Sequence, residues 1–139
     1  MRVLAVDVGT KRTGIAVSDP LGYTAQPLET WQCRTPVEDA GHIAQLATYY
    51  QAELVLVGHP ITLGGSASPQ TVKAEAFAAT LQERCTCPVR LWDERLTTAQ
   101  GERALIEGGV RREKRRHVVD QVAAQLLLQQ YLDAQRGKA

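Results

Sequence analysis

The chain has 139 residues, of which 44% are hydrophobic and 22% charged, and its net charge is +1. This length buries one core and leaves no room for a second folding unit, so we expect residues 1–139 to form a single domain. The balanced charge and an aromatic content of 5% do not by themselves indicate a nucleic-acid-binding or membrane-surface protein. No segment approaches the ~20 apolar residues of a membrane span, and three cysteines provide no even-numbered disulfide framework. The composition therefore predicts a cytoplasmic protein with reduced thiols and no membrane partner.

The first predicted elements are strands. Residues 3–8 are apolar except for Asp7, residues 9–14 form a polar turn, and the apolar pattern then resumes, which is typical of a β-hairpin. Residues 23–30 predict a third, weaker strand that Pro27 interrupts. Three strands without an intervening helix predict an antiparallel meander.

Helices and strands alternate after this meander. Thr35 and Pro36 are typical of a helix start, and Gly108 of a helix end. In order, we expect a helix over 36–50, a strand over 54–58, a loop over 58–68, a helix over 69–85, a strand over 89–92, a helix from Thr97 or Thr98 to Glu107, and a final helix that begins between Arg115 and Val119 and reaches about Ala134. A meander followed by βαβ units predicts an α/β fold with a mixed sheet and helices on both faces.

Two acidic residues stand at the ends of predicted strands. Asp7 shares a strand face with Val3 and Ala5 by the alternation of side chains, and a charge there needs hydrogen-bond partners, a cation or an exposed strand end. Glu94 follows the last predicted strand, and spacing alone does not say whether Asp93 or Glu94 faces a site. The alternatives are that Asp7 caps the following turn and that Glu94 belongs to a surface ion-pair cluster.

A third acidic residue lies in the final predicted helix. At ~100° per residue, Asp120 falls near the middle of an apolar arc that includes Ala123 and Ala124, opposite a polar arc that includes Gln125 and Gln129. A carboxylate on the core-facing side needs a partner, which is either a neighbouring strand or basic side chain, or a bound ion.

Taken together, Asp7, Glu94 and Asp120 suggest a metal site. Carboxylate oxygens are hard ligands suited to Mg²⁺ or Mn²⁺. A divalent ion relieves the repulsion between clustered carboxylates while it holds phosphate oxygens and a water nucleophile. The predicted chemistry is phosphodiester hydrolysis.

Two phosphate-binding alternatives do not fit the turn at residues 9–14. The sequence GTKRTG matches neither G-x-x-x-x-G-K-[ST], because Ile15 and Ala16 follow it, nor G-x-G-x-x-G. An Asp-x-Gly-Thr strand and turn also occurs in actin-like and sugar-kinase ATPases, whose nucleotide sits between two domains. This chain is too short to supply both domains.

Four segments in order along nearly the whole chain resemble the YqgF/RuvX family. They are AVDVGTKRTGIA at 5–16, VGHP at 57–60, DERLTT at 93–98 and VDQVAA at 119–124. The resemblance implies an RNase H-like fold of the RuvC resolvase type, with a mixed five-stranded sheet flanked by helices. It also implies a divalent-metal-dependent nuclease whose acidic ligands are Asp7, Glu94 and Asp120.

The resemblance and the charge pattern together indicate where nucleic acid binds. Residues 101–139 carry 8 basic and 5 acidic groups, whereas residues 1–50 and 51–100 carry 4 and 5 each. Most of this excess lies just before the predicted final helix and would attract a phosphate backbone with little base specificity; the alternative is a basic solvated loop. The candidate phosphate contacts are Lys11, Arg12, Arg95, Thr97, Arg111, Arg112, Lys114, Arg115 and Arg116.

The leading functional hypothesis is a nuclease that matures the 5′ end of small-subunit ribosomal RNA, a role that the resemblance implies. One alternative is a Holliday junction resolvase acting on branched DNA, which requires a homodimer. Another is a non-catalytic nucleic-acid binder or ribosome-assembly factor, against which the intact carboxylate set counts. RuvC-type resolvases carry a further acidic residue where this chain has Ala123 and Ala124, so the number of metal ions stays open. His59 is predicted to be a solvent-facing loop histidine, with substrate contact as the alternative.

Overall fold

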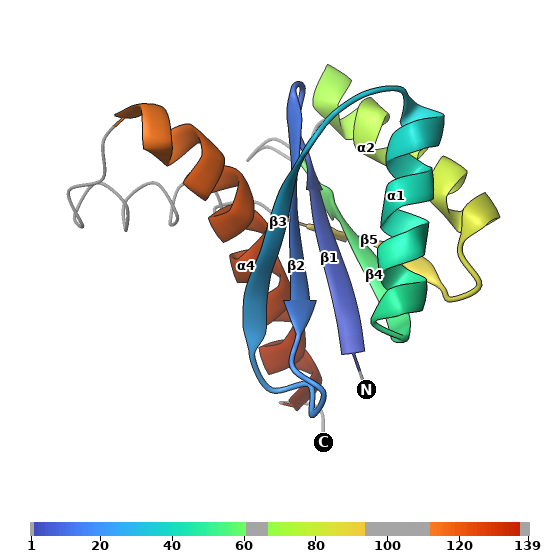
Figure 1. Cartoon of the computed structure of the whole chain (residues 1–139), viewed down its shortest axis with the longest axis vertical. Helices are drawn as coiled ribbons and strands as arrows, with labels where there is room; N and C mark the ends of the chain where they lie inside the picture. The colour runs from blue at the N-terminus through green and yellow to red at the C-terminus, as the bar shows by residue number, and fades with distance from the viewer. Residues whose placement is uncertain (1, 61–66, 94–111, 137–139) are drawn as a thin grey trace.

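The computed structural model describes residues 2–60, 67–93 and 112–136, and for residues 112–121 and 136 it describes the backbone only. Five strands form one mixed sheet in the order β3-β2-β1-β4-β5 (Figure 1). β1 pairs antiparallel with β2 and β2 with β3, whereas β1 and β4, and β4 and β5, run parallel. The strands are β1 (Arg2–Val8), β2 (Arg12–Ser18), β3 (Ala25–Gln32), β4 (Ala52–His59) and β5 (Val89–Asp93). The predicted meander and mixed sheet are confirmed.

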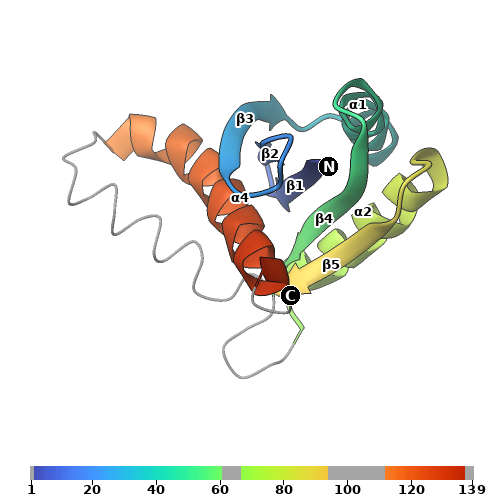
Figure 2. The same ribbon diagram turned by 90° about the horizontal axis from the view of Figure 1, so that it is seen from below.

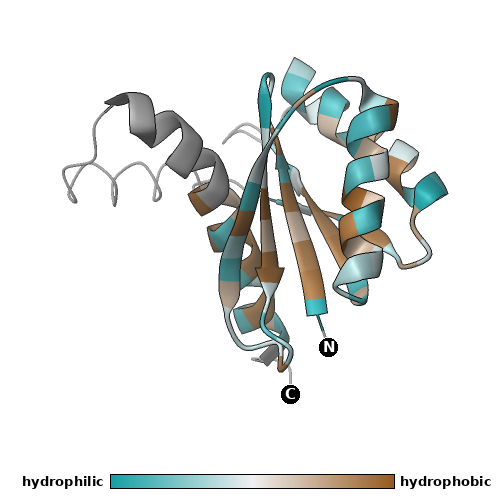
Figure 3. Ribbon diagram, in the orientation of Figure 1, coloured by the Kyte–Doolittle hydropathy of each residue, from teal (hydrophilic) through white to brown (hydrophobic). Residues whose placement is uncertain are grey.

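Helices cover both faces of the sheet. α1 (Pro36–Tyr49) and α2 (Pro69–Arg84) lie on one face, and α4 (Arg112–Arg136) lies on the other (Figure 2). Figure 3, a ribbon coloured by hydropathy, shows hydrophobic residues along the central strands between these layers and hydrophilic residues at the β1–β2 turn. None of the helices in the described ranges combines the length and apolarity that a bilayer crossing needs.

Side-chain alternation on β1 divides the core into two clusters. Leu4 and Val6 pack toward α1 and α2, whereas Val3 and Ala5 pack toward α4. All four are buried. This alternation also sets the face on which the last residues of β1 lie.

The third strand is displaced from its predicted position by two residues at each end. It begins at Ala25 rather than Tyr23 and ends at Gln32 rather than Thr30. Pro27 lies within it opposite Ala16, and the register shifts at that point because Ile15 pairs with Glu29. Proline is tolerated there because β3 is an edge strand and the irregularity absorbs the missing N–H.

The predicted start of the final helix is wrong. α4 begins at Arg112, before the interval from Arg115 to Val119 in which we expected it. The basic run therefore lies mostly in the first turns of a helix, not in a loop. Apolar periodicity is absent there, but Arg, Lys and Glu have high helix propensity and extend the helix without it. The predicted helix from Thr97 or Thr98 to Glu107 lies outside the described residues.

Two glutamines of α4 bind the edge strand, although the sequence places them on the polar arc of the helix. Gln129 Oε1 accepts a hydrogen bond from the Ala25 N–H at 2.9 Å, and Gln125 Nε2 donates to the Ala25 carbonyl at 3.1 Å. Gln129 Nε2 also donates to the Tyr23 carbonyl at 3.1 Å. These bonds satisfy backbone groups at the start of β3 and hold α4 against the sheet.

We expect Gln129→Ala to lower the free energy of unfolding by about 1–3 kcal/mol, because it leaves the part-buried Ala25 N–H without its acceptor. Urea denaturation followed by circular dichroism measures this. Gln130→Ala is the matched control: the neighbouring side chain is exposed, so its change should stay within about 0.5 kcal/mol. Equal effects of the two substitutions would contradict the bracing role of Gln129.

Candidate active site

The parallel strands β1, β4 and β5 bring their carboxyl ends to one edge of the sheet. Asp7 lies near the end of β1, and His59 and Asp93 are the last residues of β4 and β5, paired in register. Glu94 follows Asp93 directly in the sequence but lies outside the described residues. Ligand sites in open α/β sheets favour this edge.

Asp7 lies between glycine positions on the two neighbouring strands. On β2 its register partner is Gly14, and on β4 the residue after Val57, the partner of Val6, is Gly58. A glycine within a strand often marks a close approach of a ligand or another backbone. Asp7 is partly exposed, and neither glycine has a side chain that would cover its carboxylate.

The helix that covers the Asp7 face is the one that carries Asp120. Asp7 shares the alternation of Val3 and Ala5, whose cluster includes Ala124 of α4. Asp120 lies one turn before Ala124 in that helix. α4, the helix predicted to supply an acidic ligand, therefore packs on the sheet face to which strand alternation assigns Asp7. The side chain of Asp120 is not among those described.

The turn after Asp7 is held by backbone hydrogen bonds and by one side chain from α2. The Gly9 N–H donates to the Arg12 carbonyl at 2.9 Å, and the Cys33 N–H donates to the Lys11 carbonyl at 2.9 Å. Lys73 Nζ donates to the Gly9 carbonyl at 2.9 Å. Lys11, which is exposed, and Arg12, which is partly exposed, thus lie at the same edge as Asp7.

His59 is not the solvent-facing loop residue that the sequence predicts. β4 continues through His59, and its side chain is only 21% exposed because it lies against α2. His59 Nε2 is buried without a hydrogen bond, 3.7 Å from Glu75 Oε2. By strand alternation His59 lies on the face of Val57, the opposite face from Asp7.

Several predicted site residues are not placed by the structure. Within the described residues there is no group of three or more His, Cys, Asp or Glu side chains that could hold a metal ion. This finding does not test the proposed carboxylate set, because two of its three side chains are not described. Glu94, Arg95, Thr97 and Arg111 lie outside the described residues, and Arg112, Lys114, Arg115 and Arg116 lie in the first turns of α4, where only the backbone is described.

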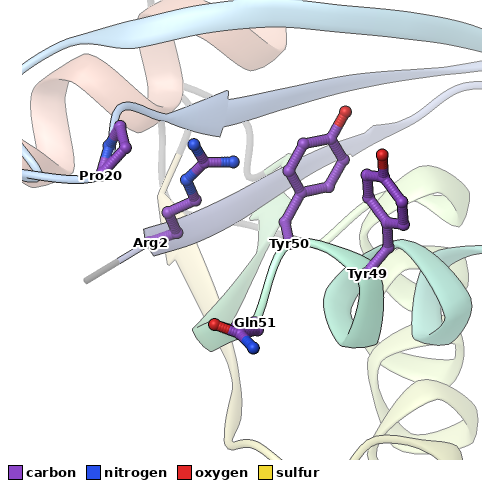
Figure 4. Close-up of a pocket in the computed structure, with 5 residues that line it drawn as sticks. All are labelled: Arg2, Pro20, Tyr49, Tyr50 and Gln51. Atoms are coloured by element: carbon purple, nitrogen blue, oxygen red, sulfur yellow. The ribbon is translucent and has the colours of Figure 1, made fainter.

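The opposite edge of the sheet has a pocket of different chemistry (Figure 4). The Arg2 guanidinium carbon lies 5.4 Å from the centroid of the Tyr50 ring at the amino end of β1. None of the described residues that line this pocket carries a carboxylate. It is lined by Arg2, Pro20, Tyr49, Tyr50 and Gln51.

Two side chains with shifted pKa values lie outside the candidate site. The Thr24 N–H donates to Asp19 Oδ1 at 2.7 Å in the β2–β3 turn and lowers the pKa of that carboxyl. Burial, with a smaller contribution from neighbouring Cys87, raises the pKa of the Cys85 thiol to about 11. Burial therefore favours the neutral thiol form of Cys85 near pH 7.

Sequence reasoning missed two features of the site. Gly14 and Gly58 could have been identified from the sequence, because a glycine inside a strand pattern is uncommon and often marks a close approach of a ligand or another backbone. Lys73 could not have been identified in this way, because it contacts a turn 64 residues earlier in the chain.

The comparisons with known proteins cover nearly the whole chain. A family model described as "RuvX: Holliday junction resolvase" matches residues 1–134. A protein of Halalkalibacterium halodurans named "Putative pre-16S rRNA nuclease" is 47% identical, over 99% of this chain and 100% of its own length. A protein of the same name from Listeria innocua is 44% identical, over 96% of this chain and 98% of its own length.

Solved structures share the fold at low sequence identity. RuvC of T. thermophilus in complex with a Holliday junction substrate has a TM-score of 0.57 and 19% identity, covering 100% of this chain and 98% of that chain. The Fowlpox virus resolvase in complex with Holliday junction DNA has a TM-score of 0.59 and 15% identity, covering 97% and 99%. The fold is therefore RNase H-like, of the RuvC type, as the sequence predicts.

Two glycine substitutions should have opposite effects on the free energy of unfolding. A Cβ on Gly9 would lie 2.3 Å from the Arg12 carbonyl oxygen, so Gly9→Ala should displace the turn and lower the free energy of unfolding by about 1–3 kcal/mol. Gly41 in α1 has nothing within 4 Å of such a Cβ, so Gly41→Ala should stabilise by about 0.5–1 kcal/mol through helix propensity. Urea denaturation of both variants measures these changes, and stabilisation by Gly9→Ala would contradict the close approach.

Proposed function

The chain belongs to the RuvX family, and from this premise we propose that it is a divalent-metal-dependent nuclease that processes the 5′ end of precursor 16S ribosomal RNA. The observation that carries the proposal is the position of Asp7. It lies at the carboxyl edge of the sheet, between two glycine positions and on the face that α4 covers. We also propose that residues 1–139 act as one cytoplasmic nuclease domain.

Asp7, Glu94 and Asp120 are the proposed ligands of Mg²⁺ or Mn²⁺. Asp7 fits this role because its carboxylate is a hard donor, is partly exposed and lies beside glycine positions at the carboxyl edge of the sheet. A bound ion would lower the pKa of a water molecule and stabilise charge on the leaving oxygen. The protein's contribution is to hold the carboxylates on a strand and a helix that are fixed by core packing, so that the ligands are positioned before the substrate arrives.

Basic residues around this edge are the proposed phosphate contacts. Lys11 and Arg12 extend from the turn that follows Asp7, and the turn's hydrogen bonds fix the backbone from which they project. Arg95 and Thr97 follow Glu94 in the sequence, and the basic run from Arg111 to Arg116 leads into α4. Such contacts position a nucleic acid through its backbone, so binding should weaken with salt and discriminate little between bases.

Ribosomal RNA is the favoured substrate because relatives that match nearly the whole chain are named "Putative pre-16S rRNA nuclease". The second candidate is a Holliday junction resolvase, which the description of the matching family model favours. That activity requires a homodimer that presents two sites to one junction. Symmetrical nicking of a four-way DNA junction, with no cleavage of a ribosomal RNA precursor, would identify the second candidate.

Asp7→Asn should lower the cleavage rate of a ribosomal RNA precursor by about 10²-fold or more, because it removes a charged ligand from the metal site. Cleavage should require Mg²⁺ or Mn²⁺ and stop in EDTA. The rate is measured from radiolabelled RNA on denaturing gels. Glu53→Gln is the matched control: this exposed carboxylate lies near the start of β4, at the other edge of the sheet, and its loss should leave the rate unchanged. Undiminished cleavage in Asp7→Asn or in EDTA would refute the metal site.

Substitutions at the two consecutive acids test which one serves the site. Asp93 is the last residue of β5 and alternates with Trp92, which packs on the α4 face. We therefore expect Glu94→Gln to reduce cleavage as strongly as Asp7→Asn, and Asp93→Asn to retain most of it. Single-turnover rates for both variants at saturating Mn²⁺ measure this. The reverse order would assign Asp93, and not Glu94, to the metal.

A further inference from the structure

Lys73 of α2 is an exposed lysine held beside the turn that follows Asp7. Its Nζ donates to the Gly9 carbonyl at 2.9 Å, two residues after Asp7 in the chain. An ammonium group has three donors, and this contact occupies one of them. The contact orients a flexible side chain at this edge of the sheet, and the residues that the structure describes leave its other two donors without an acceptor.

The positive charge of Lys73 is not neutralised by a carboxylate in the part of the chain that the structure describes. The nearest acidic residue in sequence on α2, Glu75, is directed toward His59, with Glu75 Oε2 3.7 Å from His59 Nε2. A backbone carbonyl orients an ammonium group but does not cancel its charge. Lys73 therefore adds a full positive charge to the edge at which a polyanion is proposed to bind.

α2 is anchored at the same edge, so Lys73 is carried on a fixed support. Ser68 caps the helix, and the Thr71 hydroxyl donates to the Pro60 carbonyl just beyond the end of β4. Lys73 is the fifth residue of α2, close to this anchored end. Figure 1 shows the start of α2 at the same end of the molecule as the β1–β2 turn.

We propose that Lys73 is a phosphate-binding residue, oriented by the Gly9 carbonyl, that extends the nucleic-acid contact surface from the β1–β2 turn onto α2. The proposal rests on the proposed nuclease function and adds a residue that no sequence pattern indicates. Lys11 and Arg12 contact the substrate backbone from the turn itself, and Lys73 contacts it from the helix beside the turn. The two remaining Lys73 donors bind oxygens of a backbone phosphate that lies beside the β1–β2 turn.

The test measures binding separately from cleavage. A fluorescently labelled single-stranded RNA is titrated with the full chain carrying Asp7→Asn, in EDTA, over a series of salt concentrations. Adding Lys73→Gln should weaken binding about three- to tenfold at low salt and lower the salt slope by about 0.7, the value for one lost phosphate contact on a single strand. Lys73→Arg should retain the salt slope, because it keeps the charge.

Arg84 provides the matched control. It is an exposed cation in the last turn of the same helix, about 16 Å along the axis from Lys73. Arg84→Gln removes the same charge and should change affinity by less than about twofold. Equal losses for Arg84→Gln and Lys73→Gln would mean a general charge effect and would overturn the proposal.

Cleavage assays in the wild-type background separate a binding role from a positioning role. Lys73→Gln should raise KM for the ribosomal RNA precursor while kcat falls less than KM rises. A lower kcat with unchanged affinity and salt slope would mean that Lys73 only positions the Asp7 turn, and it would overturn the proposal. The binding titration is independent of catalysis, so a failure of the nuclease function appears in the Asp7→Asn and EDTA controls and not in the effect of Lys73.

Discussion

Asp7 is an ionisable side chain on a sheet face whose earlier positions, Val3 and Ala5, are enclosed between β1 and α4. A carboxylate cannot follow them into the core unless donors or a cation compensate the lost hydration. The fully buried part of β1 ends at Val6, and Asp7 is partly exposed at the carboxyl edge of the sheet, beside Gly14 and Gly58. The open edge and the tight core are therefore consequences of one arrangement of the strands.

α4 links these two parts because one half packs on the sheet and the other half contains Asp120 and most of the basic run. Its carboxyl-terminal half buries Leu127 and Leu128 and is braced on β3 through Gln129. Toward its amino end the helix extends away from the sheet, as Figure 1 shows. Asp120 lies near the transition between the two parts, and the basic residues lie beyond it. Packing at one end of a stiff helix thus sets where Asp120 stands relative to β1.

Alternating hydrophobicity and glycine or proline boundaries were enough to predict the five strands and the meander, although β3 lies two residues later than predicted. They failed where stability comes from contacts that a local pattern does not contain. Gln129 belongs to the polar arc of its helix, yet its side chain faces the sheet because it accepts a hydrogen bond from the backbone N–H of Ala25 on the edge strand. His59 precedes a Gly- and Ser-rich segment, yet pairing with β5 and the cover of α2 make it a strand residue. Lys73 joins two segments distant in sequence, and only the fold brings them together.

A site that holds carboxylates and attracts a polyanion must resolve an electrostatic conflict. The screening length is about 8 Å at physiological ionic strength, so basic residues farther than this from Asp7 do little to offset its repulsion of an approaching phosphate. Cations beside Asp7 can offset this repulsion, and Lys11 and Arg12 follow Asp7 within five residues in a turn fixed by hydrogen bonds. Lys73 reaches the same turn from another element of the fold. The near-zero net charge of the chain is therefore compatible with a strongly polarised edge, in which acidic strand ends and basic turn residues lie side by side.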